Sequence, residues 1–130
     1  MESNELFAET LHVVNRLVVQ GARDDALVVL RLLVDNPAFG LSRVIACVNC
    51  AIVYEQKGDG TAALGWYDRA IEMEEETDSC VGARFKAALL GNSGRKEEGM
   101  ELCYEHLQRR LKPDEEAALR KTLAALEAAA

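Results

Sequence analysis

The sequence predicts an all-helical protein, and its composition, glycine spacing and apolar periodicity each support this prediction. Of its 130 residues, 49% are apolar, which is enough for a core, and only two are proline. Alanine and leucine dominate, and glutamate, lysine and arginine are frequent; these side chains lose little freedom in a helix. Gly21, Gly58 and Gly94 recur at intervals of 37 and 36 residues, each between two segments of helical apolar periodicity. A period of this length predicts one helical hairpin per unit, with glycine closing its first helix.

Local signals place seven helices along the chain. Pro37 ends the second helix, because the residue before a proline disfavours the helical conformation. Ser42 is the expected N-cap of the third helix, and either Asp78 or Ser79 is that of the fifth. Thr61 is expected to open the fourth helix. The helices are expected at about residues 4–19, 23–34, 42–56, 61–75, 79–90, 96–111 and 114–129.

The middle of the chain carries small and aromatic residues at characteristic spacings. Ala51 precedes Tyr54 in one helix, and after Gly58 the next helix places Ala63 before Tyr67. This pattern resembles the signature of the tetratricopeptide repeat family, in which small residues let two helices approach and aromatic residues fill the gaps between hairpins. The resemblance implies a single domain over residues 1–130, built as a right-handed α-solenoid of three helical hairpins and a capping helix. The implied repeats cover about residues 7–40, 44–77 and 80–113, and the capping helix about 114–129.

The last helix has the pattern of a solenoid cap. Pro113 fits its first turn, and Leu119, Leu123 and Leu126 form an apolar stripe at helical spacing. A cap of this kind is needed because the last hairpin of a solenoid would otherwise expose its apolar face.

The resemblance also implies a binding surface. In this family the first helices of successive hairpins line a concave groove that holds an extended or helical peptide. The chain is therefore expected to be a protein–protein interaction module, an adaptor or scaffold, whose groove is largely apolar and has Arg84 as its clearest contact for an anion. The corresponding positions are Leu11, Asn15, Val18, Val48, Asn49, Ile52, Glu55, Val81, Arg84, Ala88 and Asn92.

Two other functions stay open at this point. Asn15 and Asn49 coincide with asparagines of the clamp by which some family members bind chaperone tails, but Leu11, Val81 and Phe85 occupy the positions of its basic residues. Binding of a chaperone tail is therefore not expected. The alternatives are a chaperone for secreted or exported proteins and a self-associating scaffold that forms a homo-oligomer through its cap or its open end.

No set of residues indicates catalysis, a cofactor or a metal. Cys47 and Cys50 form a Cys-x-x-Cys pair that suggests a zinc or redox site, but both lie at core positions of the repeat, where free cysteine acts as a small apolar residue. His12 and His106 have no nucleophile beside them in the sequence. The acidic run over residues 72–78 lacks the alternating ligands and glycine of a calcium loop, so a solvated helix end is expected.

Charge and hydropathy limit the partners. The formal net charge is −7 and the basic residues are scattered, which argues against nucleic acid and against an anionic membrane surface. No apolar run reaches the roughly 18 residues of a membrane span. The acidic N-terminus lacks the basic-then-apolar pattern of a secretory signal. The expected partner is a protein or peptide, and the expected location is the cytoplasm.

Overall fold

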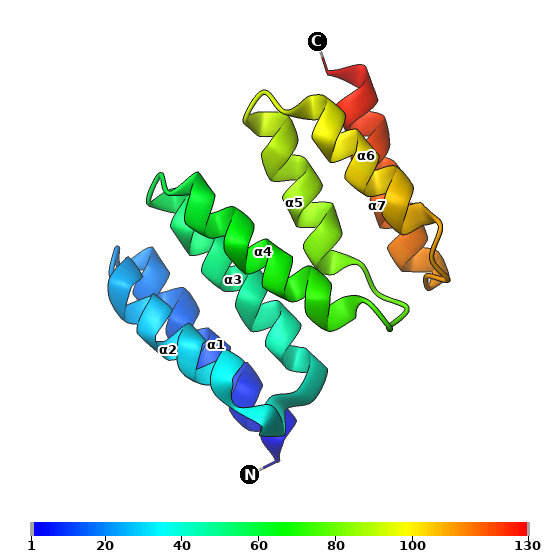
Figure 1. The fold of residues 1–130 in the computed structure, drawn as a ribbon. Coiled ribbons are helices and arrows are strands. Elements are labelled where there is room, and N and C mark those ends of the chain that lie inside the picture. The colour runs from blue at the N-terminus through cyan, green and yellow to red at the C-terminus, as the bar shows by residue number, and fades with distance from the viewer. Residues whose placement is uncertain (1, 130) are drawn as a thin grey trace. The chain divides into compact units, whose positions relative to one another are not determined.

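The computed structural model describes residues 2–129, and all the regular secondary structure in this range is helical. This confirms the predicted all-α class, and the described range contains the seven expected α-helices together with one additional 3-10 helix (Figure 1). The elements are α1 (Ser3–Val19), α2 (Arg23–Asp35), η1 (Pro37–Ser42), α3 (Arg43–Gln56), α4 (Gly60–Glu74), α5 (Val81–Asn92), α6 (Lys96–Leu107) and α7 (Pro113–Ala128).

The chain forms two compact units that divide between Trp66 and Tyr67, inside α4. In the first unit, α1 packs against α2, α2 packs against α3, and η1 contacts all three. In the second unit, α5 packs against α6, and α7 packs against both. The arrangement of three hairpin repeats in a single domain remains a prediction.

Glycines end the helices as the sequence predicts. Gly21, Gly58 and Gly94 all have positive φ angles, of 80°, 79° and 76°. After α5, the amide of Arg95 donates to the carbonyl of Leu90 at 2.8 Å, and the amide of Gly94 donates to that of Gly91. These two bonds are the Schellman pattern, which satisfies the last carbonyls of a helix and needs a residue that tolerates the left-handed region.

The predicted helix starts are confirmed in part. Ser42 stands at the N-cap position of α3, as predicted, but its side chain makes no capping hydrogen bond, because η1 runs directly into α3. The fourth helix begins at Gly60, beside the predicted Thr61, and the carboxylate of Asp59 caps this helix by accepting from the amide of Ala62 at 3.0 Å. The N-cap position of α5 is Cys80, which makes no side-chain capping bond.

The first unit has a core of apolar and small side chains. The rings of Phe7 and Phe39 pack with their centroids 5.4 Å apart. Cys47 and Cys50 are completely buried, in agreement with their expected place in the core. A hydrogen bond of 2.6 Å from Arg31 to the hydroxyl of Tyr54 joins α2 to α3 at the surface.

One helical stretch among residues 2–129, Pro37–Gln56, is long and apolar enough to cross a membrane by length and composition alone. A break at Gly40, with φ 54° and ψ −133°, interrupts it. Seven residues of α3 are buried, and this helix packs against α2. Because a core helix of this kind is necessarily apolar, the composition of the stretch is explained by its place in the first unit.

The second unit has a core to which α7 contributes its leucine stripe. Leu119, Leu123 and Leu126 are 0%, 7% and 6% exposed, as expected for a capping helix. They pack in one cluster with Cys80, which precedes α5, with Ala83 and Ala87 of α5 and with Cys103 of α6.

Two glycines create the space for Leu126. A Cβ atom at Gly91 of α5 would overlap Cδ2 of Leu126. A Cβ atom at Gly99 of α6 would lie 3.3 Å from Cδ1 of the same leucine and 2.8 Å from the carbonyl oxygen of Ala87. The close approach of these three helices therefore depends on the absence of side chains at both positions.

Two identical substitutions should shift stability in opposite directions. Gly99→Ala places a methyl group against the backbone of Ala87, and such overpacking costs about 1–3 kcal/mol. Gly65→Ala, in α4, meets no atom within 4 Å and should gain about 0.5–1 kcal/mol from helix propensity. Urea unfolding followed by circular dichroism measures both. If Gly99→Ala is as stable as the wild type, the packing of α5, α6 and α7 described above is incorrect.

Candidate binding site

The predicted groove residues differ in exposure. Asn15, Ala88 and Asn92 are exposed, while the remaining positions other than Val48 are half-buried: Leu11, Val18, Asn49, Ile52, Glu55, Val81 and Arg84. Val48 is only 5% exposed, so its assignment to an accessible groove is wrong. The physical reason is helical periodicity, which places it on the buried face of α3 with Val44, Cys47 and Ala51.

The exposed groove residues lie at two separate hollows. In the first unit, Asn15 lines a shallow hollow of about 570 Å³ along α1, together with His12 and Val19. In the second unit, Ala88 and Asn92 line a hollow of about 630 Å³. Asn49 of α3 is already engaged, since its amide donates to the carbonyl of Ile45 in its own helix at 2.9 Å. The larger hollow is therefore the stronger candidate for a binding site.

This larger hollow, called here the α5–α7 hollow, lies where the C-terminal halves of α5 and α7 meet the start of α6. The two helices run in the same direction (Figure 1). Its floor consists of Gly91 and Leu126, and Ala88 and Asn92 of α5 form one wall. Thr122 and Ala125 of α7 form the opposite wall. Small side chains on both walls keep the space open.

The rim of the α5–α7 hollow is charged. Lys96 and Lys121 lie on it, with Glu97 as the one carboxylate among the described residues that line it. The ammonium of Lys96 donates to the carbonyl of Ala129 at 2.8 Å. Neither Lys121 nor the side-chain amide of Asn92 has a protein partner within residues 2–129. Both therefore offer unused donors beside an apolar floor.

The sequence pattern predicts only a capping role for α7, and Lys121, Thr122 and Ala125 are not among the predicted site residues. The helical period predicts that these three residues lie beside the leucine stripe. Their proximity to α5 cannot be predicted without knowing the direction in which α7 packs.

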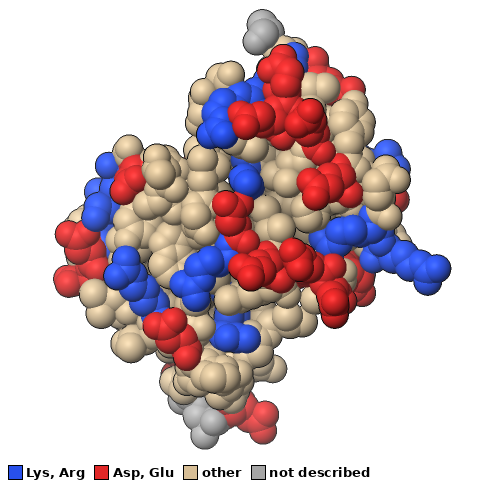
Figure 2. All heavy atoms as spheres, viewed as in Figure 1, with Lys and Arg blue, Asp and Glu red and all other residues tan. Residues whose placement is uncertain are grey.

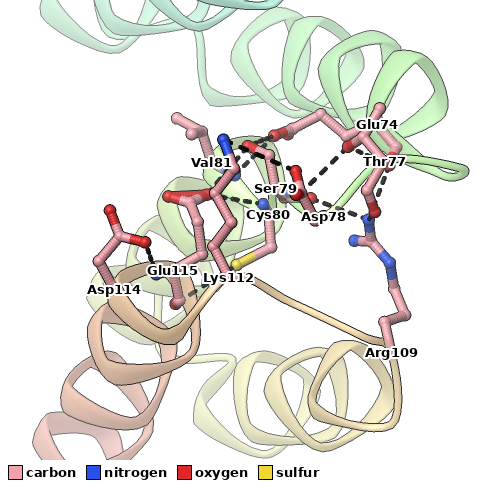
Figure 3. Close-up of polar contacts among 10 residues, drawn as sticks. All are labelled: Glu74, Thr77, Asp78, Ser79, Cys80, Val81, Arg109, Lys112, Asp114 and Glu115. Atoms are coloured by element: carbon pink, nitrogen blue, oxygen red, sulfur yellow. Dashed lines mark hydrogen bonds and ion pairs between the residues drawn. The ribbon is translucent and has the colours of Figure 1, made fainter.

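A buried carboxylate fixes the start of α5. Glu74, at the end of α4, is only 2% exposed. Its carboxylate accepts from the amide of Val81 at 2.9 Å, and its Oε2 lies 2.5 Å from the hydroxyl of Ser79 (Figure 3). The carboxylate also accepts from the amide of Gly82 at 2.7 Å. Glu74 thus supplies the acceptor expected from Asp78 or Ser79, and it also stabilises the positive end of the helix. The prediction that the whole acidic run is solvated is wrong at this residue.

A guanidinium group from the α6–α7 connection holds the same turn. One nitrogen of Arg109 donates to the backbone carbonyls of Glu74, Thr77 and Ser79 at 2.7, 2.7 and 2.8 Å (Figure 3). Another nitrogen lies 2.9 Å from Nδ1 of His106. Burial, followed by the charge of Arg109, lowers the pKa of this histidine, so the neutral ring accepts at Nδ1 and carries its proton on Nε2.

The first turn of α7 completes the network. Glu115 accepts from the amide of Cys80 at 2.8 Å, and the hydroxyl of Ser79 lies 2.9 Å from the same oxygen. The amide of Lys112 donates to the carbonyl of Asp78 at 2.9 Å. These bonds, with those of Glu74 and Arg109, are called here the N-terminal lock. They hold the starts of α5 and α7 together and so set the direction of both walls of the hollow.

All four cysteines are buried. Burial is the main cause that raises the pKa of Cys80 and of Cys103 to about 11, and at Cys80 the carboxylates of Glu115 and Glu74 act in the same sense. Thiols of this kind are protonated at neutral pH, whereas a redox nucleophile needs a lowered pKa. Within residues 2–129, no group of three or more histidine, cysteine, aspartate or glutamate side chains is placed to hold a metal ion.

Comparisons with known proteins assign no family to the chain: no family model, curated protein or solved structure gives a significant match.

The N-terminal lock makes a testable contribution to stability. Glu74→Gln keeps the side-chain length but replaces an acceptor oxygen with a donor that faces other donors. The free energy of unfolding should fall by about 1–3 kcal/mol, the cost of leaving buried polar groups unpaired. Glu72→Gln, at an exposed position of the same helix, is the matched control and should unfold like the wild type. Equal stability of the two variants in urea unfolding would show that Glu74 does not hold the turn.

Proposed function

We propose that this chain is a protein-interaction module that binds a segment of a partner protein in the α5–α7 hollow. The observation that carries the proposal is the hollow itself, which has a volume of about 630 Å³ beside helices that the N-terminal lock and Leu126 hold in place. Binding sites of this size are typically concave, with an apolar lining and a few polar groups. The proposed activity is binding without catalysis, and the proposed location is the cytoplasm.

The lining suits a side chain from another protein. Ala88, Ala125 and Gly91 expose little beyond methyl groups and backbone, and Leu126 adds an apolar surface at the bottom. Burial of one large apolar side chain contributes about 1.5–3 kcal/mol. The free donors of Asn92 and Lys121 would orient the bound segment, as a small number of polar groups does in most such sites.

The register of α5 and α7 supports a tetratricopeptide-type arrangement of the second unit. Glu115 contacts Cys80, which lies 35 residues earlier, and Leu126 contacts Gly91 at the same separation. This separation is close to the interval between the helix-ending glycines. In the proposed solenoid of three hairpins, α7 therefore takes the place of the first helix of a further repeat, and the hollow lies on the groove side.

Exposed apolar side chains of the first unit favour self-association as a second candidate. Val19 is 86% exposed, Leu32 68%, Leu41 62% and Val28 61%. Exposed apolar groups gain free energy when another protein covers them.

Capture of a partner from a cell extract by two matched variants tests the proposed site. The full chain, immobilised, is exposed to an extract of its source cells, and Ala125→Trp is compared with Ala124→Trp. The indole at position 125 should fill the hollow and weaken binding of the partner at least about tenfold, a loss of about 1.4 kcal/mol. Position 124 is exposed on the same helix but does not line the hollow.

Circular dichroism checks that both variants fold. If both variants keep the same partners as the wild type, the α5–α7 hollow is not the binding surface. If the wild type retains no protein beyond the bare resin, the interaction proposal fails.

A further inference from the structure

We infer that the segment bound in the α5–α7 hollow is acidic and carries one large apolar side chain between its acidic residues. This inference rests on the proposed function and adds the chemistry of the partner. It follows from the shape of the floor, from the charges on the rim and from a third cation along α5.

The floor selects an apolar side chain. Gly91 lacks a side chain and Leu126 is 6% exposed, so the deepest part of the hollow offers backbone and methyl groups only. The hydroxyl of Thr122 is engaged, since it donates to the carbonyl of Ala118 at 3.1 Å. A polar group placed on this floor would lose its hydration without a hydrogen-bond donor to replace it.

The rim selects acidic neighbours. Lys96 and Lys121 lie on the rim of the hollow, and among residues 2–129 Glu97 is the single carboxylate that lines it. A basic segment would have one anion to pair with and two cations to avoid. The first turn of α6, which begins at Lys96, has no side-chain cap and adds its positive helix end to the same rim.

The basic rim differs in charge from the rest of the second unit. Acidic residues outnumber basic ones over residues 67–130. Figure 2 shows acidic side chains gathered over α6 and over the C-terminal end of α4. The lysines of the hollow therefore attract anions locally, although the second unit is acidic as a whole. Because salt screens charges beyond about 10 Å, these nearby lysines decide which charge the bound segment carries.

Arg84 of α5 adds a third basic residue to Lys96 and Lys121. It lies one helical turn before Ala88, on the same face of the helix. Its guanidinium stacks 5.2 Å from the ring of Phe85, and its buried Nε has no hydrogen-bond partner. An acidic residue placed one turn away from the apolar anchor would reach this group.

A random library provides an unbiased probe. A phage-displayed dodecapeptide library is panned on the immobilised full chain, and the strongest peptide is synthesised for fluorescence anisotropy. The enriched sequences should contain aspartate or glutamate on both sides of one leucine, isoleucine, phenylalanine, methionine or tryptophan. Binding should weaken as the salt concentration rises, because the rim contacts are exposed ion pairs.

Matched charge reversals assign the preference to the hollow. Lys121→Glu should weaken the acidic peptide at least about tenfold, equivalent to about 1.4 kcal/mol. Arg120→Glu makes the same change in net charge at an exposed neighbour whose contact, at 3.6 Å, is with Glu116, and it should bind like the wild type. Lys121→Arg keeps the charge and should retain most of the affinity.

The outcomes separate the two proposals. Peptides that Ala125→Trp displaces but that are basic or uncharged would overturn the inferred chemistry and leave the proposed site in place. Equal losses in Lys121→Glu and Arg120→Glu would also overturn it, because the effect would then come from net charge. Peptides that bind Ala125→Trp as well as the wild type, or a library that yields no binder, would contradict the proposed function.

Discussion

The second unit depends on a carboxylate that is buried and fully supplied with donors. A buried charge without partners is costly, so Glu74 constrains the chain to the conformation that brings Ser79 and the amides of Val81 and Gly82 to it. Arg109 then ties three backbone carbonyls of the same turn, of which that of Glu74 also accepts from the amide and the hydroxyl of Thr77. Because Arg109 belongs to the α6–α7 connection, the turn before α5 and the start of α7 are fixed by one set of bonds.

The position of α7 is set at both of its ends, by different forces. Its first turn is polar, and Glu115 and Lys112 bind the turn before α5. Its last turns are apolar, and Leu126 enters the space that Gly91 and Gly99 leave. Directional hydrogen bonds give the register, and close packing gives the depth. The α5–α7 hollow is the remaining space beside Leu126, which exists because the walls carry alanines and the rim carries long charged side chains that extend into solvent.

The sequence predicted the parts of this structure that follow from local rules. Helical periodicity gave the seven helices, Gly94 and its equivalents gave their ends, and the leucine spacing of α7 gave its buried face. The N-terminal lock could not be read in the same way, since Arg109 and its carbonyl partners lie 30–35 residues apart. The groove positions were inferred from a family register that allows no check on burial, and so Val48 was assigned to a surface that it does not reach. Lys121 was missed because the direction of α7 is a tertiary property.

Amide hydrogen exchange in Arg109→Ala tests most directly whether one lock holds both walls of the hollow. Arg110→Ala, at the exposed neighbouring position, is the control. The account predicts that exchange accelerates together in residues 77–82 and in the first turns of α7, while α1 and α2 keep their wild-type rates. An acceleration confined to residues 77–79, with α7 unchanged, would contradict it, because α7 would then be held without the lock.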